Sequence, residues 1–322
     1  MNREQTLFAA LKERLTQTIV GQSQLLDHLL TGLLADGHVL IEGLPGLAKT
    51  TAARALAAAT HLSFSRIQFT PDLIPGDVTG TDVLNPADAT FRFAPGPVFH
   101  ELILADEINR APPKVQSALL EAMQERQVTT GGTTRALPAV FWVLATQNPL
   151  EHEGTFPLPE AQLDRFMLKI NVSYPSADDE LIMLQRAQHS TQSTASESAL
   201  PPLLSSADIL NARAQVRDVY MDEMLARYIV ALVNATREPG KWLSDVGACF
   251  EYGASPRATL ALARCAKAHA YLRQRQFVEP GDIMAMSEPV LQHRVELNFS
   301  ARSNGWRVQD LLRRLVAAVP VP

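Results

Sequence analysis

The stretch HVLIEGLPGLAKTT, at residues 38–51, combines a short apolar run, a loop with two glycines and the start of an alanine-rich segment. Residues 39–41 predict a buried strand, and residues 50–59 predict a helix. A strand, a glycine-bearing loop and a helix in this order form a cradle for phosphate. The reason is that loop amides and the positive end of a helix both point at anionic oxygens. We therefore expect this stretch to bind the phosphates of a nucleotide.

Two polar side chains at the end of the loop strengthen this interpretation. Lys49 adds a positive charge for the outer phosphates, and the hydroxyl of Thr50 is placed to ligate Mg²⁺. The match to the usual phosphate-loop pattern is imperfect, because Ala48 stands where glycine is expected, and alanine fits there only with a negative φ. The alternative is a chance strand–turn–helix with a stray lysine. The candidate nucleotide-binding residues are Gly43, Leu44, Pro45, Gly46, Leu47, Ala48, Lys49, Thr50 and Thr51.

Composition limits the class of protein. The chain has 322 residues, enough for one large or two ordinary domains, and its hydrophobic content of 46% supports a sizeable core. The formal net charge of −5 argues against a dedicated nucleic-acid binder, because such proteins are usually basic.

The cysteines and the apolar runs bear on the compartment. Cys249 and Cys265 form neither a metal pattern nor a disulfide framework, which suits a reducing compartment, and the eight histidines add no dense metal cluster. The first 15 residues interleave charged and apolar side chains, unlike a signal peptide. No stretch approaches the roughly 18 uncharged apolar residues of a membrane span. We expect a cytoplasmic protein without structural zinc.

A second polar signal follows another apolar run. Residues 100–105 predict a strand that ends in the adjacent carboxylates Asp106 and Glu107. Ligands of a parallel sheet bind beyond the carboxyl ends of its strands, so both acids would face the phosphates. Asp106 suits the water shell of Mg²⁺, and Glu107 suits activation of the attacking water. The alternative is a solvated strand end.

Asn148 and Arg165 are weaker candidates. Asn148 ends the apolar run at residues 139–148 and could hold the attacking water, but an asparagine before Pro149 is also a common turn cap. Arg165 precedes the last predicted strand, at residues 167–172, and by itself suits a surface ion pair. Residues 65–69 predict a further strand. Residues 70–97 and 128–135 predict an inserted hairpin or loop and a hairpin, respectively.

The second half of the chain is predicted to be helical. A boundary at Ser173 divides an α/β nucleotide-binding domain, residues 1–172, from a lid domain, residues 173–322. The predicted lid helices are residues 178–189, 206–219, 221–237, 256–275, 279–293 and 308–319, with a linker at 190–206. Helices are also expected at residues 4–18 and 23–34, and the break between them either packs against a purine base or is a plain connection.

The order of these motifs resembles that of AAA+ ATPases and, more narrowly, of the MoxR family. The resemblance spans roughly residues 20–295, most of the chain, and the run after Asp106 is very specific. The carrying stretches are EGLPGLAKT at 42–50, FRFAPGPVF at 91–99, LADEINRAPPKVQSALLEAMQERQVT at 104–129, ATQNP at 145–149, GTFPLPEAQLDRF at 154–166 and GASPR at 253–257. Alanine at position 48 also occurs in this family.

The resemblance implies a P-loop AAA+ core, with a parallel sheet flanked by helices, followed by an all-helical lid. Asn148 matches the sensor-1 position and Arg257 matches sensor 2. Arg165 matches the arginine finger that reaches the γ-phosphate of a neighbouring subunit, with Arg110 as another interface candidate. Ser255 and Pro256 form a good helix start, which would aim Arg257 from a mobile lid at the phosphates.

The resemblance also implies a function. We expect a Mg²⁺-dependent ATPase in a ring, as a hexamer, that remodels or matures protein clients together with a partner containing a von Willebrand factor A domain. One alternative is a DNA-stimulated AAA+ motor, which the acidic net charge disfavours. Another is a nucleotide-gated scaffold without hydrolysis, which the intact Asp106–Glu107 pair disfavours.

Overall fold

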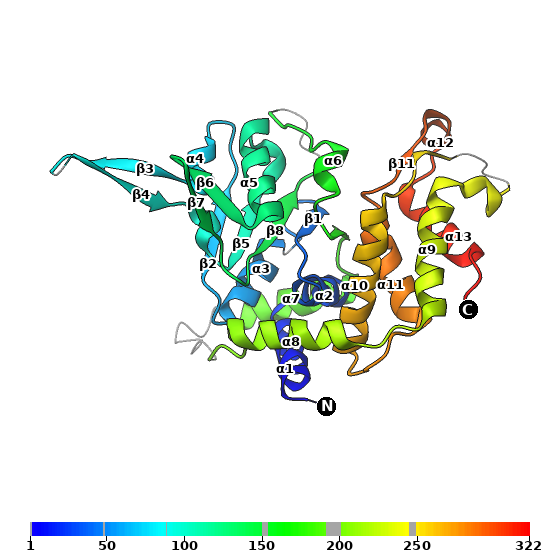
Figure 1. The fold of residues 1–322 in the computed structure, drawn as a ribbon. Coiled ribbons are helices and arrows are strands. Elements are labelled where there is room, and N and C mark those ends of the chain that lie inside the picture. Colours follow the sequence, from blue (N-terminus) through cyan, green and yellow to red (C-terminus); the bar gives the residue numbers. More distant parts are fainter. Residues whose placement is uncertain (1, 48, 88, 150–153, 191–200, 245–248) are drawn as a thin grey trace.

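A five-stranded parallel sheet lies at the centre of the first half of the chain (Figure 1). The computed structural model describes residues 2–47, 49–87, 89–149, 154–190, 201–244 and 249–322. Across the sheet the strands are β2 (Phe64–Gln68), β5 (Leu102–Asp106), β8 (Trp142–Gln147), β1 (Val39–Gly43) and β9 (Leu168–Val172). All four pairings are parallel, so the carboxyl ends of the five strands lie along one edge.

Helices cover both faces of the sheet, as the continuous apolar character of its inner strands requires. They are α1 (Arg3–Thr18), α2 (Ser23–Leu34), α3 (Lys49–Ala58), α5 (Pro113–Glu125) and α6 (Glu160–Leu163). Neighbouring strand residues point to opposite faces. Ile41 and Leu144 therefore join the apolar cluster under α1, α2 and α3, whereas Leu40 and Val143 join the cluster under α5.

Two antiparallel hairpins interrupt the α/β order, as the sequence predicts. They pair β3 (Gly80–Asn85) with β4 (Thr90–Pro95), and β6 (Gln127–Thr130) with β7 (Thr133–Ala136). The β3–β4 hairpin projects away from the body of the molecule (Figure 1). The guanidinium of Arg135 stacks 3.8 Å from the centre of the Phe93 ring and joins the two hairpins. The short elements near them are α4 (Pro75–Thr79), η1 (Pro97–Phe99) and η2 (Ile108–Arg110).

The second half is helical, with one exception. Its elements are α7 (Ala177–Ser190), α8 (Ser206–Asp218), α9 (Glu223–Arg237), η3 (Pro239–Lys241), α10 (Pro256–Leu272), α11 (Pro280–Leu291), α12 (Phe299–Ser303) and α13 (Val308–Ala318). The exception is an antiparallel ribbon of β10 (Phe250–Tyr252) and β11 (Glu296–Leu297), so this half is not all-helical as expected. Strands of three and two residues are too short to leave a period-two pattern in the sequence.

The two halves share one apolar cluster, which continues from α2 into α8, α10 and α11. An ion pair between a buried arginine and a half-buried aspartate reinforces this packing. Arg213 of α8 contacts Asp36 at 2.6 Å and donates to the carbonyl oxygen of Leu33 at 2.9 Å. Burial opposes ionisation of Asp36, but Arg213 and Arg126 outweigh it and lower the pKa of this carboxyl. Among the described helices, none combines the length and apolar character needed to cross a membrane.

Trp142 provides a test of how β8 is anchored. Its indole N–H donates to the carbonyl oxygen of Gly37 at 2.7 Å, and the side chain is fully buried. We expect Trp142→Phe to lower the free energy of unfolding by about 1–3 kcal/mol, since a buried carbonyl then loses its donor. Urea unfolding measures this loss. The control Trp242→Phe, at a side chain 37% exposed, should shift stability by only about 0.5 kcal/mol, and equal losses would contradict this account.

Candidate functional site

The candidate phosphate cradle lies where β1 passes into α3. Gly43 ends β1 against β9, and a Cβ atom added to it would lie 3.0 Å from the carbonyl oxygen of Val172. Gly46 has φ +84°, and a Cβ atom there would meet no described atom within 4 Å. The loop therefore needs glycine at Gly46 for its backbone, and it leaves open space beside its amides. Ala48 lies outside the described residues.

Lys49 is the first residue of α3 and reaches back over the loop. Its Nζ atom donates to the carbonyl oxygen of Gly43 and, at 3.3 Å, to that of Gln147. The ammonium thus sits between the carboxyl ends of β1 and β8. Neutral carbonyls are weaker partners for an ammonium than phosphate oxygens are. This arrangement leaves Lys49 able to exchange them for an anionic ligand.

Asp106 is the point where three neighbouring elements meet. Its Oδ2 atom accepts from the hydroxyl of Thr50 at 3.3 Å, and its Oδ1 atom accepts from the hydroxyl of Thr146 at 2.6 Å. The guanidinium of Arg66 donates to the same Oδ2 atom, at 3.0 Å from Nε and 2.7 Å from a terminal nitrogen. A hydroxyl and a carboxylate so close together are hard oxygen ligands of the kind that Mg²⁺ prefers. Thr50 and Asp106 therefore fit a Mg²⁺ ion.

Glu107 lies just beyond β5 in a left-handed conformation, with φ 60° and ψ 51°. Such a backbone is uncommon outside glycine and is often found where strain serves a site. Its N–H donates to the hydroxyl of Thr146 at 2.9 Å. Its Oε2 atom accepts from the amide of Gln68 at 3.0 Å and lies 3.3 Å from Nε of Arg110. The carboxylate is therefore oriented by β2 on one side and by its own turn on the other.

Asn148 follows β8 and is buried beside the same strand ends. Its carbonyl oxygen accepts from the side-chain amide of Asn109 at 3.5 Å. The structure thus brings Lys49, Thr50, Asp106, Glu107 and Asn148 to one edge of the sheet.

Sequence reasoning missed three side chains at this edge: Arg66, Gln68 and Thr146. The sequence held a signal for Arg66 and Gln68, because both are polar residues in a short predicted strand. The strand that follows it in the sequence ends in two acids. The observed register pairs Gln68 with Asp106 directly.

Arg165 and Arg257 lie at the opposite end of the sheet. Both line a cavity of about 240 Å³ together with His38, which directly precedes β1. Arg165 donates to the carbonyl oxygen of Leu120 at 2.9 Å, and Arg257 contacts Asp164 at 3.4 Å. Thus, contrary to expectation, Arg257 does not point at the phosphate loop of its own chain.

The start of α10 explains where Arg257 lies. The hydroxyl of Ser255 donates to Asp164 at 3.2 Å, and the buried Arg294 contacts the same carboxylate at 2.8 Å. Asp164 comes shortly before β9, so these bonds hold the start of α10 at the amino end of that strand. This tertiary contact joins residues far apart in the sequence, and a local pattern does not reveal it.

The cavity around Arg257 is rich in positive charge. Five arginines line it against two aspartates: Arg126, Arg165, Arg257, Arg264 and Arg294 against Asp36 and Asp164. Burial lowers the pKa of His38 to about 4, so this histidine is neutral at pH 7. Arg257 and Arg264 are exposed. This surface, which we call the arginine face, is suited to an anion outside the chain.

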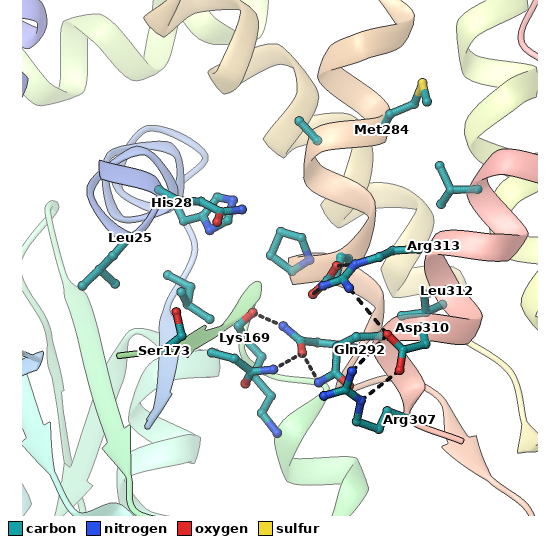
Figure 2. A pocket seen from close by; sticks show the side chains of 18 of the residues that line it. Leu25, His28, Lys169, Ser173, Met284, Gln292, Arg307, Asp310, Leu312 and Arg313 are labelled. Atoms are coloured by element: carbon teal, nitrogen blue, oxygen red, sulfur yellow. Dashed lines mark hydrogen bonds and ion pairs between the residues drawn. The ribbon is translucent and has the colours of Figure 1, made fainter. Parts of the chain in front are cut away.

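A larger cleft of about 920 Å³ separates α2 and β9 from α11 and α13. Figure 2 shows Leu25 and His28 of α2 on one side and Met284 and Arg313 on the other. At its edge, the amide of Gln22 donates to the carbonyl oxygen of Ser173 at 3.1 Å. Ser173 directly follows Val172, the neighbour of Gly43, so the cleft opens beside the phosphate loop.

Comparisons with known proteins identify a family. Residues 38–168 match the family described as ATPases associated with various cellular activities, and residues 244–315 match its lid domain. The chain is 44% identical to chaperone MoxR1 of Mycobacterium tuberculosis, over 94% of this chain and 79% of that protein. It is 42% identical to YeaC of Bacillus subtilis, over 96% and 93%. A solved structure from Cytophaga hutchinsonii superposes with a TM-score of 0.90, at 42% identity over 99% and 96% of the two chains.

The contact between Arg66 and Asp106 generates a prediction for the proposed metal ligands. The positive charge of Arg66 lies beside the carboxylate that would bind the cation and repels that cation. Arg66→Gln removes this repulsion and should tighten binding of Mn²⁺ with ATP by roughly tenfold. Electron paramagnetic resonance of free Mn²⁺ measures this affinity. The control Arg227→Gln removes an exposed charge on α9 and should change nothing. Unchanged or weaker Mn²⁺ binding by the Arg66 variant would contradict the prediction.

Proposed function

This chain belongs to the MoxR family of AAA+ ATPases, and from that premise we propose that it uses ATP hydrolysis to remodel or mature protein complexes. Membership of this family makes it a nucleotide-binding ATP hydrolase. One observation carries the assignment of roles. An ammonium, a hydroxyl and two carboxylates, from Lys49, Thr50, Asp106 and Glu107, converge where β1, β5 and β8 end.

In the proposed reaction, Lys49 and the loop amides bind the outer phosphates. Thr50 and Asp106 hold Mg²⁺, which when bound neutralises charge on the phosphate oxygens. Glu107 accepts the proton of the attacking water, and Asn148 orients that water. The different partners of the two acids support this division of roles, because Asp106 accepts from Thr50, whereas Glu107 accepts from Gln68 and pairs with Arg110.

We place the base of the nucleotide at the edge of the large cleft, near Gln22 and Ser173. This edge adjoins the phosphate loop through Val172 and Gly43. An amide and a hydroxyl there offer both donors and acceptors for a purine. The break between α1 and α2, at residues 19–22, is then a contact to the base.

Arg165 and Arg257 act, in this proposal, on the nucleotide of a neighbouring subunit. Both lie at the amino end of the sheet, away from the phosphate loop of their own chain. A head-to-tail arrangement brings the arginine face of one subunit to the phosphates of the next, and it closes into a ring. We propose a hexamer. Arg110 is a weaker candidate for this role, because it pairs with Glu107 of its own chain.

A protein client accounts for an exposed apolar surface on the β3–β4 hairpin. Val83, Leu84 and Phe91 are all at least half exposed on this projecting element (Figure 1). Contiguous exposed apolar side chains usually mark an interaction site. We propose that the hairpin contacts the client and that a von Willebrand factor A domain protein is a partner. We also propose that the protein acts in the cytoplasm, where its free cysteines Cys249 and Cys265 stay reduced.

Glu107→Gln tests the proposed general base. The amide keeps the shape of the side chain but cannot accept the proton, so turnover should fall by roughly 10²-fold or more while ATP still binds. Phosphate release measures turnover, and a fluorescent ATP analogue measures binding. Glu13→Gln, an exposed change on α1, is the control. Turnover close to that of the control would remove the role assigned to Glu107.

A mixing experiment tests action between subunits. Arg165→Ala should bind ATP normally but hydrolyse it roughly 10³-fold more slowly, as expected for a loss of an arginine supplied by a neighbour. Adding Lys49→Ala protein, which keeps Arg165 but lacks the phosphate contact, should restore part of the activity. The double variant Lys49→Ala, Arg165→Ala is the control and should restore none. If both partners give equal activity in mixed assemblies, Arg165 does not act in trans.

A further inference from the structure

The side chains of α7 that the structure describes are exposed except for the half-buried Asp179, although the centre of the helix is apolar. Leu181, Ile182, Met183 and Leu184 follow one another, and each is at least 40% exposed. Leu181 and Leu184 are 53% and 56% exposed, and their spacing places them on one side of the helix. An α-helix of 14 residues is marginal in water without packing against an apolar face. This pattern indicates a surface that another molecule covers.

Contacts hold α7 beside the nucleotide cleft. A Cβ atom added to Gly21 would lie 2.8 Å from the carboxylate of Asp179, and Arg186 bonds to the carbonyl oxygen of Gln17 at the end of α1. Asp179 and Arg186 therefore face the junction of α1 and α2, whose residue Gly21 lines the cleft. Leu181 and Leu184 lie on a different side, toward solvent. This solvent side of α7 is therefore open to a neighbouring subunit.

The arginine face carries an exposed apolar side chain between positive charges, which complements the apolar and acidic surface of α7. Leu260 of α10 lines its cavity, is 68% exposed and stands one turn after Arg257. Exposed Arg257 and Arg264 flank it on the same helix. In the first turn of α7 the exposed acids are Asp178 and Glu180, whereas Asp179 faces the junction of α1 and α2. An apolar patch beside acids on one surface thus corresponds to an apolar side chain between arginines on the other.

We infer that α7 docks on the N-terminal part of α10 in a second copy of this chain, with Leu181 and Leu184 packed around Leu260. This inference rests on the proposed action of Arg165 and Arg257 between subunits, because that action requires the arginine face to approach the neighbour's phosphate loop. The contact is head-to-tail, so every subunit uses both surfaces. It makes assembly, and with it the delivery of the two arginines, depend on α7.

Charged substitutions on the two surfaces test the contact. Leu184→Glu disrupts the α7 surface and Leu260→Glu disrupts the α10 surface. The controls are Gln185→Glu, which adds the same charge to an exposed position of α7, and Leu260→Met, which stays apolar. Sedimentation velocity of the full chain with a non-hydrolysable ATP analogue reports assembly. Far-UV circular dichroism and thermal melting show that each variant is folded.

We expect both glutamate variants to need roughly tenfold more protein, or higher, for half-assembly, while the controls match the wild type. Mixing Leu184→Glu with Leu260→Glu should give a species of two chains and no larger one, because one intact junction remains. Unimpaired assembly of the Leu184→Glu protein would overturn the inference and leave a client as the occupant of α7. If both glutamate variants lose assembly but their mixture forms no species of two chains, the pairing of α7 with α10 is wrong.

The assembly test of α7 and the mixing test of Arg165 can fail independently. If the glutamate variants assemble normally and Arg165→Ala is still rescued by mixing, the arginines act between subunits through a contact other than α7. If the glutamate variants fail to assemble as expected but Arg165→Ala is not rescued, α7 forms the junction while the role of Arg165 is wrong.

Discussion

The carboxylate of Asp106 is the constraint around which the proposed active site is built. It lies at the end of a fully buried strand, where Thr50, Thr146 and Arg66 converge on it from three neighbouring elements. A buried carboxylate needs such partners, because an unpaired charge at this depth is costly. The same bonds tie α3, β8 and β2 to the end of β5, so the phosphate loop and Glu107 are held at one edge. The proposed chemistry therefore depends on one side chain that three elements hold in place.

The groups that the proposal assigns to hydrolysis lie at two opposite ends of the parallel sheet. The carboxyl end carries the loop, the acids and Lys49, whereas the amino end carries the arginine face around His38 and Asp164. In the proposed reaction the phosphate-binding groups come from one end and Arg165 and Arg257 from the other. This separation is why a head-to-tail assembly is the natural form of the proposed enzyme. Hydrolysis would then report whether a neighbour is present.

Much of this could be predicted from sequence, because buried parallel strands are apolar runs with polar ends. Residues 39–41 and 100–107 show that pattern directly. The two hairpins could also be predicted, because each has two extended runs on either side of a turn. Arg66 and Gln68 stand out as polar residues of a predicted strand, but their pairing with the acids could not be predicted, since it depends on β2 lying next to β5 in a particular register. The place of Arg257 also escaped prediction. It follows from the tertiary bonds of Ser255 and Arg294 to Asp164.

The central claim is that magnesium and the nucleotide phosphates bind where β1 passes into α3, beside Asp106 and within reach of a neighbour's arginines. An experimental structure of the assembled protein with Mg²⁺ and a non-hydrolysable ATP analogue tests it most directly. The account predicts the terminal phosphate next to Lys49 and Asp106, with Arg165 of the adjacent subunit facing it. Nucleotide bound elsewhere, or subunits that meet without bringing Arg165 to the phosphates, would contradict it.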